Sequence, residues 1–100
     1  MLIKIAKTNE ISAGAMKRFT VRGKKIIIVN LEEKFYALDD TCSHNQCSLS
    51  KGELEGGIII CPCHGARFDV STGKVLALPA VKDLKIYPVQ IKKDYLYVEI

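Results

Sequence analysis

Apolar and polar residues alternate in short runs along much of this chain, a pattern typical of β-strands with one buried and one exposed face. The last stretch shows it best, because Leu96, Val98 and Ile100 share one face and the residues between them share the other. No stretch sustains a helical period over about eleven residues, and residues 9–16 form a helical turn at most. The pattern therefore predicts an all-β fold.

Turn signals separate the predicted strands. Gly23, residues 30–33 and residues 92–94 each lie between two strand-like runs, as expected for hairpin turns. Hairpins in this arrangement favour stacked antiparallel sheets within a single domain, residues 1–100. The predicted strands span residues 2–6, 19–22, 25–29, 35–38, 75–78, 85–91 and 95–100.

Composition and charge exclude several classes of protein. With 48% hydrophobic and 26% charged residues, the chain is neither disordered nor of low complexity. Its net charge of +4 comes from 15 basic and 11 acidic residues without a block of like charges. Because nucleic-acid binding needs clustered basic residues beside stacking aromatics, we expect no nucleic-acid partner.

The sequence shows no membrane or targeting segment. Its longest apolar runs, residues 26–29 and 58–63, are far shorter than the roughly 20 residues that span a bilayer. We therefore expect a soluble, cytoplasmic protein with no membrane partner. In that compartment the four cysteines are expected to bind a metal or to take part in redox chemistry, and not to form a secreted disulfide framework.

The residues that carry chemistry concentrate between positions 40 and 66. This region holds all four cysteines, both histidines and four of the seven glycines. Glycine permits tight turns and close approach of the backbone to a compact group. We therefore expect two loops inserted in the β framework, residues 42–48 and 61–66, which form a small metal-binding subdomain.

Four of these residues have the spacing of metal ligands. Cys42 and His44 are one residue apart, and after sixteen intervening residues come Cys61 and His64, with two residues between them. Two thiolates and two imidazoles suit a borderline-soft metal. A structural zinc site on the same residues stays open at this point, although zinc knuckles usually use Cys-x-x-Cys pairs. A rubredoxin-like iron site would need two such pairs, and a catalytic Cys/His pair would leave one loop unexplained.

The motifs around these residues resemble those of the Rieske iron–sulfur family. The resemblance covers roughly residues 35–100 and includes the stretches 48–52, 61–69, 72–75 and 78–80. It implies the three-sheet Rieske fold and one 2Fe-2S cluster per chain, with Cys42 and Cys61 on one iron and His44 and His64 on the other. The two loops, within about residues 40–66, would then form the cluster-binding subdomain.

The same resemblance implies a role for the two remaining cysteines. In the Rieske proteins of cytochrome bc complexes, cysteines at the positions of Cys47 and Cys63 form a disulfide that ties the two loops together. Many soluble Rieske ferredoxins lack this pair. We expect a disulfide here, and the alternative is two free thiols in a reducing cytosol.

Ala66, Phe68, Gly65 and Pro79 are expected to surround the cluster. High-potential members of the family carry Ser and Tyr where Ala66 and Phe68 stand, and those hydroxyls donate hydrogen bonds that stabilise the reduced cluster. Ala66 and Phe68 cannot donate. We therefore expect a potential in the lower part of the Rieske range, which spans about −150 to +300 mV.

The resemblance implies a one-electron carrier that is not itself an enzyme. The chain would be a monomeric Rieske ferredoxin that passes electrons from a reductase to an oxygenase or another acceptor, through a small and transient contact at the loop tips. The alternative is a Rieske-like small subunit of a larger oxidoreductase such as nitrite reductase. An anchored respiratory subunit is a third interpretation. The Cys47/Cys63 pair favours it, and the absent N-terminal membrane segment and the Ala66/Phe68 pair oppose it. The expected docking residues are Ser43, Asn45, Gln46, Gly65, Leu78 and Pro79.

Overall fold

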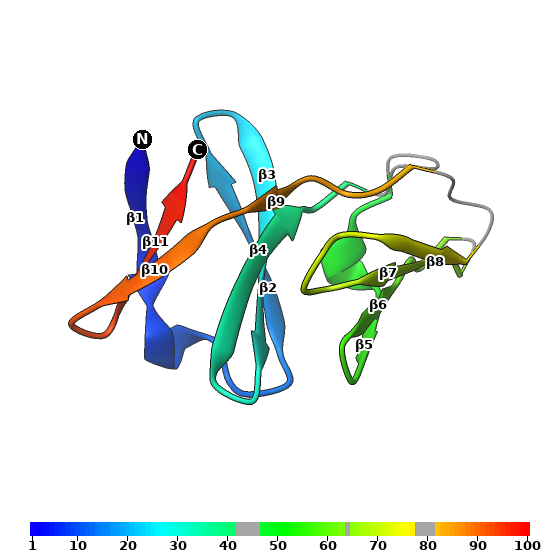
Figure 1. The fold of residues 1–100 in the computed structure, drawn as a ribbon, viewed down its shortest axis with the longest axis horizontal. Helices are drawn as coiled ribbons and strands as arrows, with labels where there is room; N and C mark the ends of the chain where they lie inside the picture. Colours follow the sequence, from blue (N-terminus) through cyan, green and yellow to red (C-terminus); the bar gives the residue numbers. More distant parts are fainter. Residues whose placement is uncertain (42–46, 64, 78–81) are drawn as a thin grey trace.

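The computed structural model describes residues 1–41, 47–63, 65–77 and 82–100. In this part of the chain the strands form three antiparallel sheets that follow one another from left to right in Figure 1. The helical segments in the described ranges are two three-residue 3-10 turns, η1 (Thr8–Glu10) and η2 (Leu49–Lys51). Neither segment has the length and apolar character needed to cross a bilayer.

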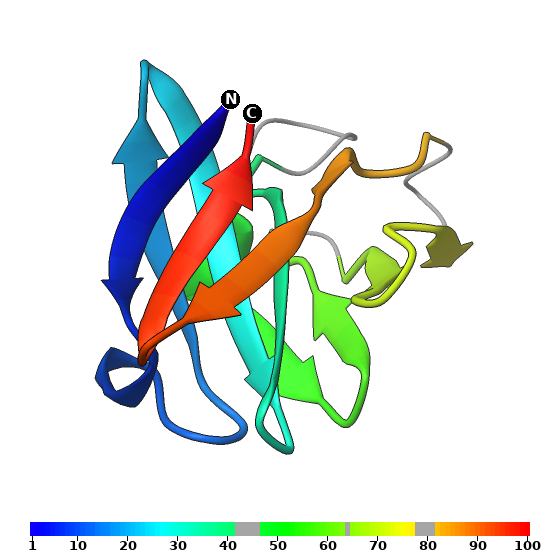
Figure 2. The same cartoon turned by 60° about the vertical axis from the view of Figure 1, so that its left-hand side comes forward.

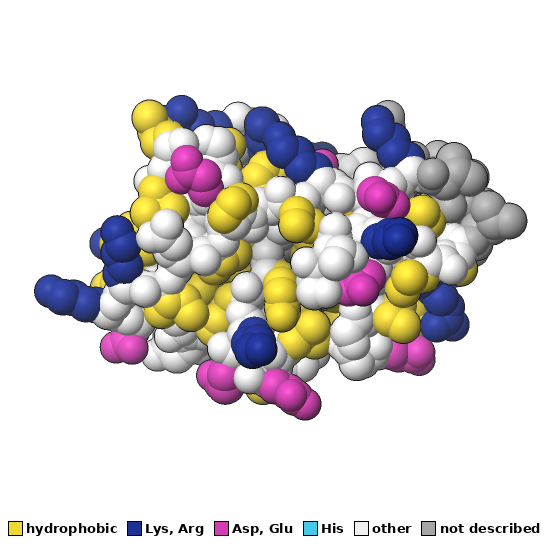
Figure 3. Space-filling view, in the orientation of Figure 1, with side chains coloured by type: hydrophobic (Ala, Val, Ile, Leu, Met, Phe, Trp, Pro, Cys, Tyr) yellow, Lys and Arg dark blue, Asp and Glu magenta, His cyan; other side chains and the backbone are white. Residues whose placement is uncertain are grey.

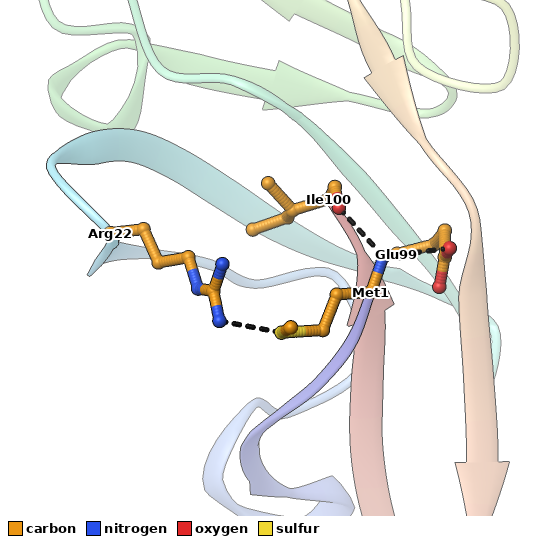
Figure 4. Close-up of polar contacts among 4 residues, drawn as sticks. All are labelled: Met1, Arg22, Glu99 and Ile100. Atoms are coloured by element: carbon orange, nitrogen blue, oxygen red, sulfur yellow. Dashed lines mark hydrogen bonds and ion pairs between the residues drawn. The ribbon is translucent and has the colours of Figure 1, made fainter.

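The first sheet, here called the terminal sheet, joins the two ends of the chain. Its strand order is β1-β11-β10, with β1 at Leu2–Lys7, β10 at Val89–Lys92 and β11 at Tyr95–Glu99. Figure 4 shows the ammonium group of Met1 donating hydrogen bonds to the Glu99 carboxylate at 2.9 Å and the Ile100 carbonyl at 2.8 Å. The Arg22 guanidinium donates to the Met1 thioether and links this sheet to the next.

The second sheet, the central sheet, has the order β2-β3-β4-β9. Its strands are β2 (Met16–Val21), β3 (Lys24–Leu31), β4 (Lys34–Asp39) and β9 (Ile86–Tyr87). Two-residue turns join the first three, and Glu32 and Glu33 in the second turn have φ angles of 51° and 71°. Positive φ at both turn residues matches the right-handed twist of the flanking strands, which is why hairpins favour such turns.

The third and smallest sheet, the loop-bearing sheet, has the order β5-β6-β7-β8. Its strands have three residues each: β5 (Glu53–Glu55), β6 (Ile58–Ile60), β7 (Arg67–Asp69) and β8 (Val75–Ala77). This sheet lies at the side of the molecule away from the chain ends (Figure 1).

Two apolar cores lie on the two faces of the central sheet. Ile26 and Ile28 pack with Leu96 and Val98 of the terminal sheet, which covers one face of the central sheet in Figure 2. On the other face Ile27 packs with residues of the loop-bearing sheet, among them Ile59 and Phe68. Because β3 is buried on both faces, its sequence is a continuous apolar run and does not alternate.

The structure confirms the all-β fold, the antiparallel sheets and the predicted hairpin turns. The prediction of one strand over residues 85–91 is wrong. Pro88 divides it, because proline has no N–H for the ladder, so β9 pairs with β4 and β10 pairs with β11 in a different sheet. The helical turn predicted within residues 9–16 lies earlier, at Thr8–Glu10. The three strands within residues 53–69 were not predicted.

Candidate metal centre

Backbone contacts join the two ends of the first loop. Asp40 and Thr41 follow the end of β4 and lead into the loop, and Ser48 at its other end pairs with Thr41 in an isolated antiparallel bridge. The Leu49 N–H then donates to the Asp40 carbonyl at 2.6 Å. These contacts fix the two ends of the loop side by side.

The carboxylate of Asp40 reinforces this closure from inside the molecule. Its side chain is fully buried, and it accepts hydrogen bonds from the Ser48 hydroxyl and, at 2.8 Å, from the Ser50 N–H. The Arg18 guanidinium of β2 lies 3.9 Å from the same carboxylate. A buried carboxylate is costly unless it is hydrogen-bonded and paired, and here both conditions are met. Asp40 therefore joins the first loop to the central sheet.

The second loop connects β6 to β7 and is closed by backbone hydrogen bonds. The Cys61 N–H donates to the Ala66 carbonyl at 2.8 Å, and the Gly65 N–H donates to the Cys61 carbonyl at 3.1 Å. Gly65 has a φ of 73°, in the left-handed region where glycine is not strained. The turn thus holds Cys61 at a fixed place between the loop and the core.

Three sulfur atoms come together where the two loops meet. The Sγ atoms of Cys47, Cys61 and Cys63 all lie within 4.8 Å of one another. Cys47 and Cys63 are joined by a disulfide whose Cα atoms are 6.4 Å apart. Cys61 is the free cysteine of the described residues and is buried, with 2% of its surface exposed.

The thiol of Cys61 fits a metal centre that is bound through thiolates. Cys61 is the one cysteine of this trio left to coordinate a metal, since the disulfide uses the other two. Its core neighbours include Ala66, Phe68 and Leu49, all with no exposed surface. Apolar neighbours exclude water from a bound centre and in that way influence its potential.

The predicted site residues divide into two groups. The structure places Cys61, Ala66 and Phe68 in one buried cluster, with partly buried Cys47 packed against it, whereas Gly65 and Cys63 are exposed. The predictions for Cys42, His44, His64 and Pro79 fall outside the described residues, as do those for Ser43, Asn45, Gln46 and Leu78.

Sequence reasoning did not single out Asp40 or the close contact at Gly52. A Cβ atom on Gly52 would lie 2.0 Å from the Ile60 carbonyl oxygen and 3.1 Å from Cδ of Pro62. The chain that follows the first loop is therefore pressed against the start of the second loop. The sequence feature that could have identified Gly52 was its position just after the Ser48-Leu49-Ser50 motif. For Asp40 the only such feature was its place two residues before Cys42.

The close approach at Gly52 makes Gly52→Ala strongly destabilising. We expect a loss of about 3 kcal/mol in the free energy of unfolding, because the methyl group has no room without a backbone shift. Gly57→Ala is the matched control, since a Cβ atom on Gly57 would have no other atom within 4 Å. The control is expected to change stability by less than about 1 kcal/mol in urea unfolding. Equal stability of the two variants would contradict the close approach.

The hydrogen bonds of Asp40 make Asp40→Asn a test of the loop closure. The amide keeps the shape but loses the charge, and its NH2 group replaces one of the two oxygens that accept hydrogen bonds from Ser48 and Ser50. We expect a loss of about 2–3 kcal/mol in stability and faster hydrogen exchange at the Leu49 and Ser50 amides. Asp94→Asn, at an exposed turn, is expected to stay within about 0.5 kcal/mol of the parent protein. Unchanged exchange at Ser50 in Asp40→Asn would contradict the proposed closure.

Comparison with known proteins connects this geometry to a family. The Rieske [2Fe-2S] domain family matches residues 1–88. The ferredoxin component of the naphthalene 1,2-dioxygenase/salicylate 5-hydroxylase systems of Ralstonia sp is 43% identical over 90 residues, which are 90% of this chain and 86% of that protein.

Solved structures show the same relationship. The ferredoxin of carbazole 1,9a-dioxygenase from Nocardioides aromaticivorans IC177 has a TM-score of 0.94 and 30% identity, over 98% of this chain and 96% of that chain. A chain in the complex of reduced oxygenase and oxidized ferredoxin in carbazole 1,9a-dioxygenase has a TM-score of 0.93 and 33% identity, over 97% and 91% of the two chains. With the family match over residues 1–88, these similarities show that the chain belongs to the Rieske [2Fe-2S] domain family, whose cofactor is a 2Fe-2S cluster.

Proposed function

We propose that this protein is a one-electron carrier that receives an electron from a reductase and passes it to an oxygenase. The observation that carries the proposal is the likeness, over nearly the whole chain, to ferredoxin components of dioxygenase systems. A relative with the same fold occurs in a complex with its oxygenase, which supports the oxygenase as acceptor. We further propose that the carrier works in the cytoplasm, as a monomer that meets its partners transiently.

We propose that Cys42, His44, Cys61 and His64 hold the 2Fe-2S cluster. The buried free thiol of Cys61 supports this assignment directly. The motif spacing supports the other three. When bound, the cluster supplies reversible one-electron chemistry.

The protein's own residues would hold the site rigid and dry. The Asp40 hydrogen bonds close the first loop, and the Cys61 and Gly65 backbone bonds close the second. The Cys47–Cys63 disulfide joins the two loops to each other. A site held this way changes little in geometry when an electron enters or leaves, which favours fast transfer.

Purification and redox titration test the function. We expect a coloured protein with iron and sulfide in equal amounts, which takes up one electron per chain and elutes near its mass of 11.1 kDa. A colourless protein that contains zinc would overturn the electron carrier. Recovery only as a tight part of a larger oxidoreductase would favour the small-subunit interpretation.

The same titration tests the expected low potential. Ala66→Ser with Phe68→Tyr would place hydroxyl donors in the buried cluster that contains Cys61. Because such donors stabilise the reduced form, we expect the potential to rise toward the upper part of the range of about −150 to +300 mV. Ala37→Ser with Phe35→Tyr makes the same chemical changes in the core between the other two sheets, and should leave the potential unchanged. Equal potentials for both double variants would contradict this role.

A further inference from the structure

A hollow lined by lysines lies at one end of the central sheet. It has a volume of about 550 Å³ and is bordered by the β2–β3 turn, the end of β4 and the start of β9. We call it the lysine hollow. Its lining residues are Gly23, Lys24, Lys25, Asp39, Thr41, Lys85 and Tyr87.

The lysine side chains of this hollow are arranged around one buried tyrosine. The Lys85 and Lys24 ammonium groups lie 5.1 Å and 5.9 Å from the centre of the Tyr87 ring, within the range of a cation–π contact. The Tyr87 hydroxyl donates to the Asp39 carboxylate at 2.6 Å. Burial, and then this carboxylate, raise the pKa of the Tyr87 phenol above its ordinary value. The phenol therefore stays neutral and adds no negative charge.

The hollow keeps an excess of positive charge. Three exposed lysines face a single carboxylate, and the four ion pairs between described residues involve none of these lysines. Exposed lysines without an acidic partner are free to attract an acidic surface.

The acidic residues of the same hairpin lie at its other end. Lys24 and Lys25 begin β3, whereas Glu32 and Glu33 form the turn after it, about 25 Å away for an eight-residue strand. Figure 3 shows Lys and Arg side chains along much of the upper edge and several Asp and Glu side chains along the lower edge. The distance between the two ends of the hairpin exceeds the Debye length of about 8 Å at physiological salt, so the acidic charges at one end do not neutralise the lysines at the other.

The lysine hollow lies next to the first loop. Thr41 lines it and is followed in the chain by Cys42. The Asp39 N–H donates to the Lys85 carbonyl at 3.0 Å, so both segments that border the hollow are fixed to each other. A protein bound at this hollow would therefore stand beside the loop to which the proposed function assigns two cluster ligands.

We propose that the lysine hollow is a docking surface for the carboxylate-rich face of a redox partner protein. The proposal rests on the proposed function, because it assigns the hollow to the protein that gives or takes the electron. Attraction between opposite charges raises the rate of encounter and orients the partners, which suits a short-lived complex. A nucleic acid fits less well, because Tyr87 is only 6% exposed and its ring is covered by lysines, so bases cannot stack on it.

The test compares electron transfer to an acidic and a basic haem protein. Reduced, cluster-loaded protein is mixed with oxidised cytochrome b5 (acidic) or cytochrome c (basic) in a stopped-flow instrument, between about 20 and 300 mM ionic strength. The hollow variant combines Lys24→Gln, Lys25→Gln and Lys85→Gln. We expect its rate with cytochrome b5 at low salt to fall about tenfold, with a flatter salt dependence, and its rate with cytochrome c not to fall.

A matched control separates the hollow from net charge. The control variant combines Lys7→Gln, Lys92→Gln and Lys93→Gln, and it removes three positive charges near the β10–β11 turn. Lys7 and Lys92 also lie over tyrosine rings, at 5.9 Å and 5.7 Å. We expect this control to change the rate with cytochrome b5 less than about twofold. Both variants should keep the reduction potential and visible spectrum of the parent protein, so that a rate change reports on encounter.

The remaining outcomes overturn the proposal in distinguishable ways. Equal losses in the hollow and control variants would show that only net charge matters. Failure of the parent protein to take up one electron in the redox titration would overturn the proposed function and the docking surface with it, and failure of the parent protein to reduce cytochrome b5 would overturn the docking surface alone. The parent protein could instead be retained on duplex DNA at about 150 mM salt where the hollow variant is not, while both reduce cytochrome b5 at the same rate. That result would assign the lysines to nucleic-acid binding.

Discussion

The arrangement of the two loops depends on the buried carboxylate of Asp40. This carboxylate accepts hydrogen bonds from the Ser48 hydroxyl and the Ser50 N–H, and it forms an ion pair with the Arg18 guanidinium of the central sheet. A full charge at this depth is tolerated only while these partners stay in place. The contact therefore fixes the chain on both sides of the first loop and sets where the loop-bearing sheet begins.

The loop-bearing sheet contributes the second loop and depends on the central sheet for its own stability. Its strands are three residues long, too short to persist alone, and they are held by packing of Ile59 and Phe68 in the core shared with Ile27. Gly52 allows the chain to cross close to Ile60, which brings the two loops together. The disulfide between Cys47 and Cys63 then joins loops that belong to different strand pairs.

The predictions succeeded where local pattern determines structure. The apolar run of β3 and the alternation of β11 are visible in the sequence, and the structure buries both as expected. Of the loop-bearing sheet only β8 was predicted, because the three-residue strands β5, β6 and β7 are too short to show a period. The strand predicted across Pro88 was wrong because the apolar pattern continues there, although the chain changes sheets. The spacing of Cys61 pointed to a ligand, but Asp40 acquires its role only when Arg18 and Ser48 approach in space.

The pairing of the two chain ends has a consequence for handling the molecule. Met1 and Ile100 are hydrogen-bonded to each other on the terminal sheet, which lies across the central sheet from the loop-bearing sheet. A tether attached at either terminus would therefore hold the protein by the side away from its two loops. On an electrode or in a fusion, both attachments would give nearly the same orientation, with the side that carries the two loops facing outward. A short linker could also join the two ends in a circular permutant with new termini elsewhere, since the native termini already lie side by side.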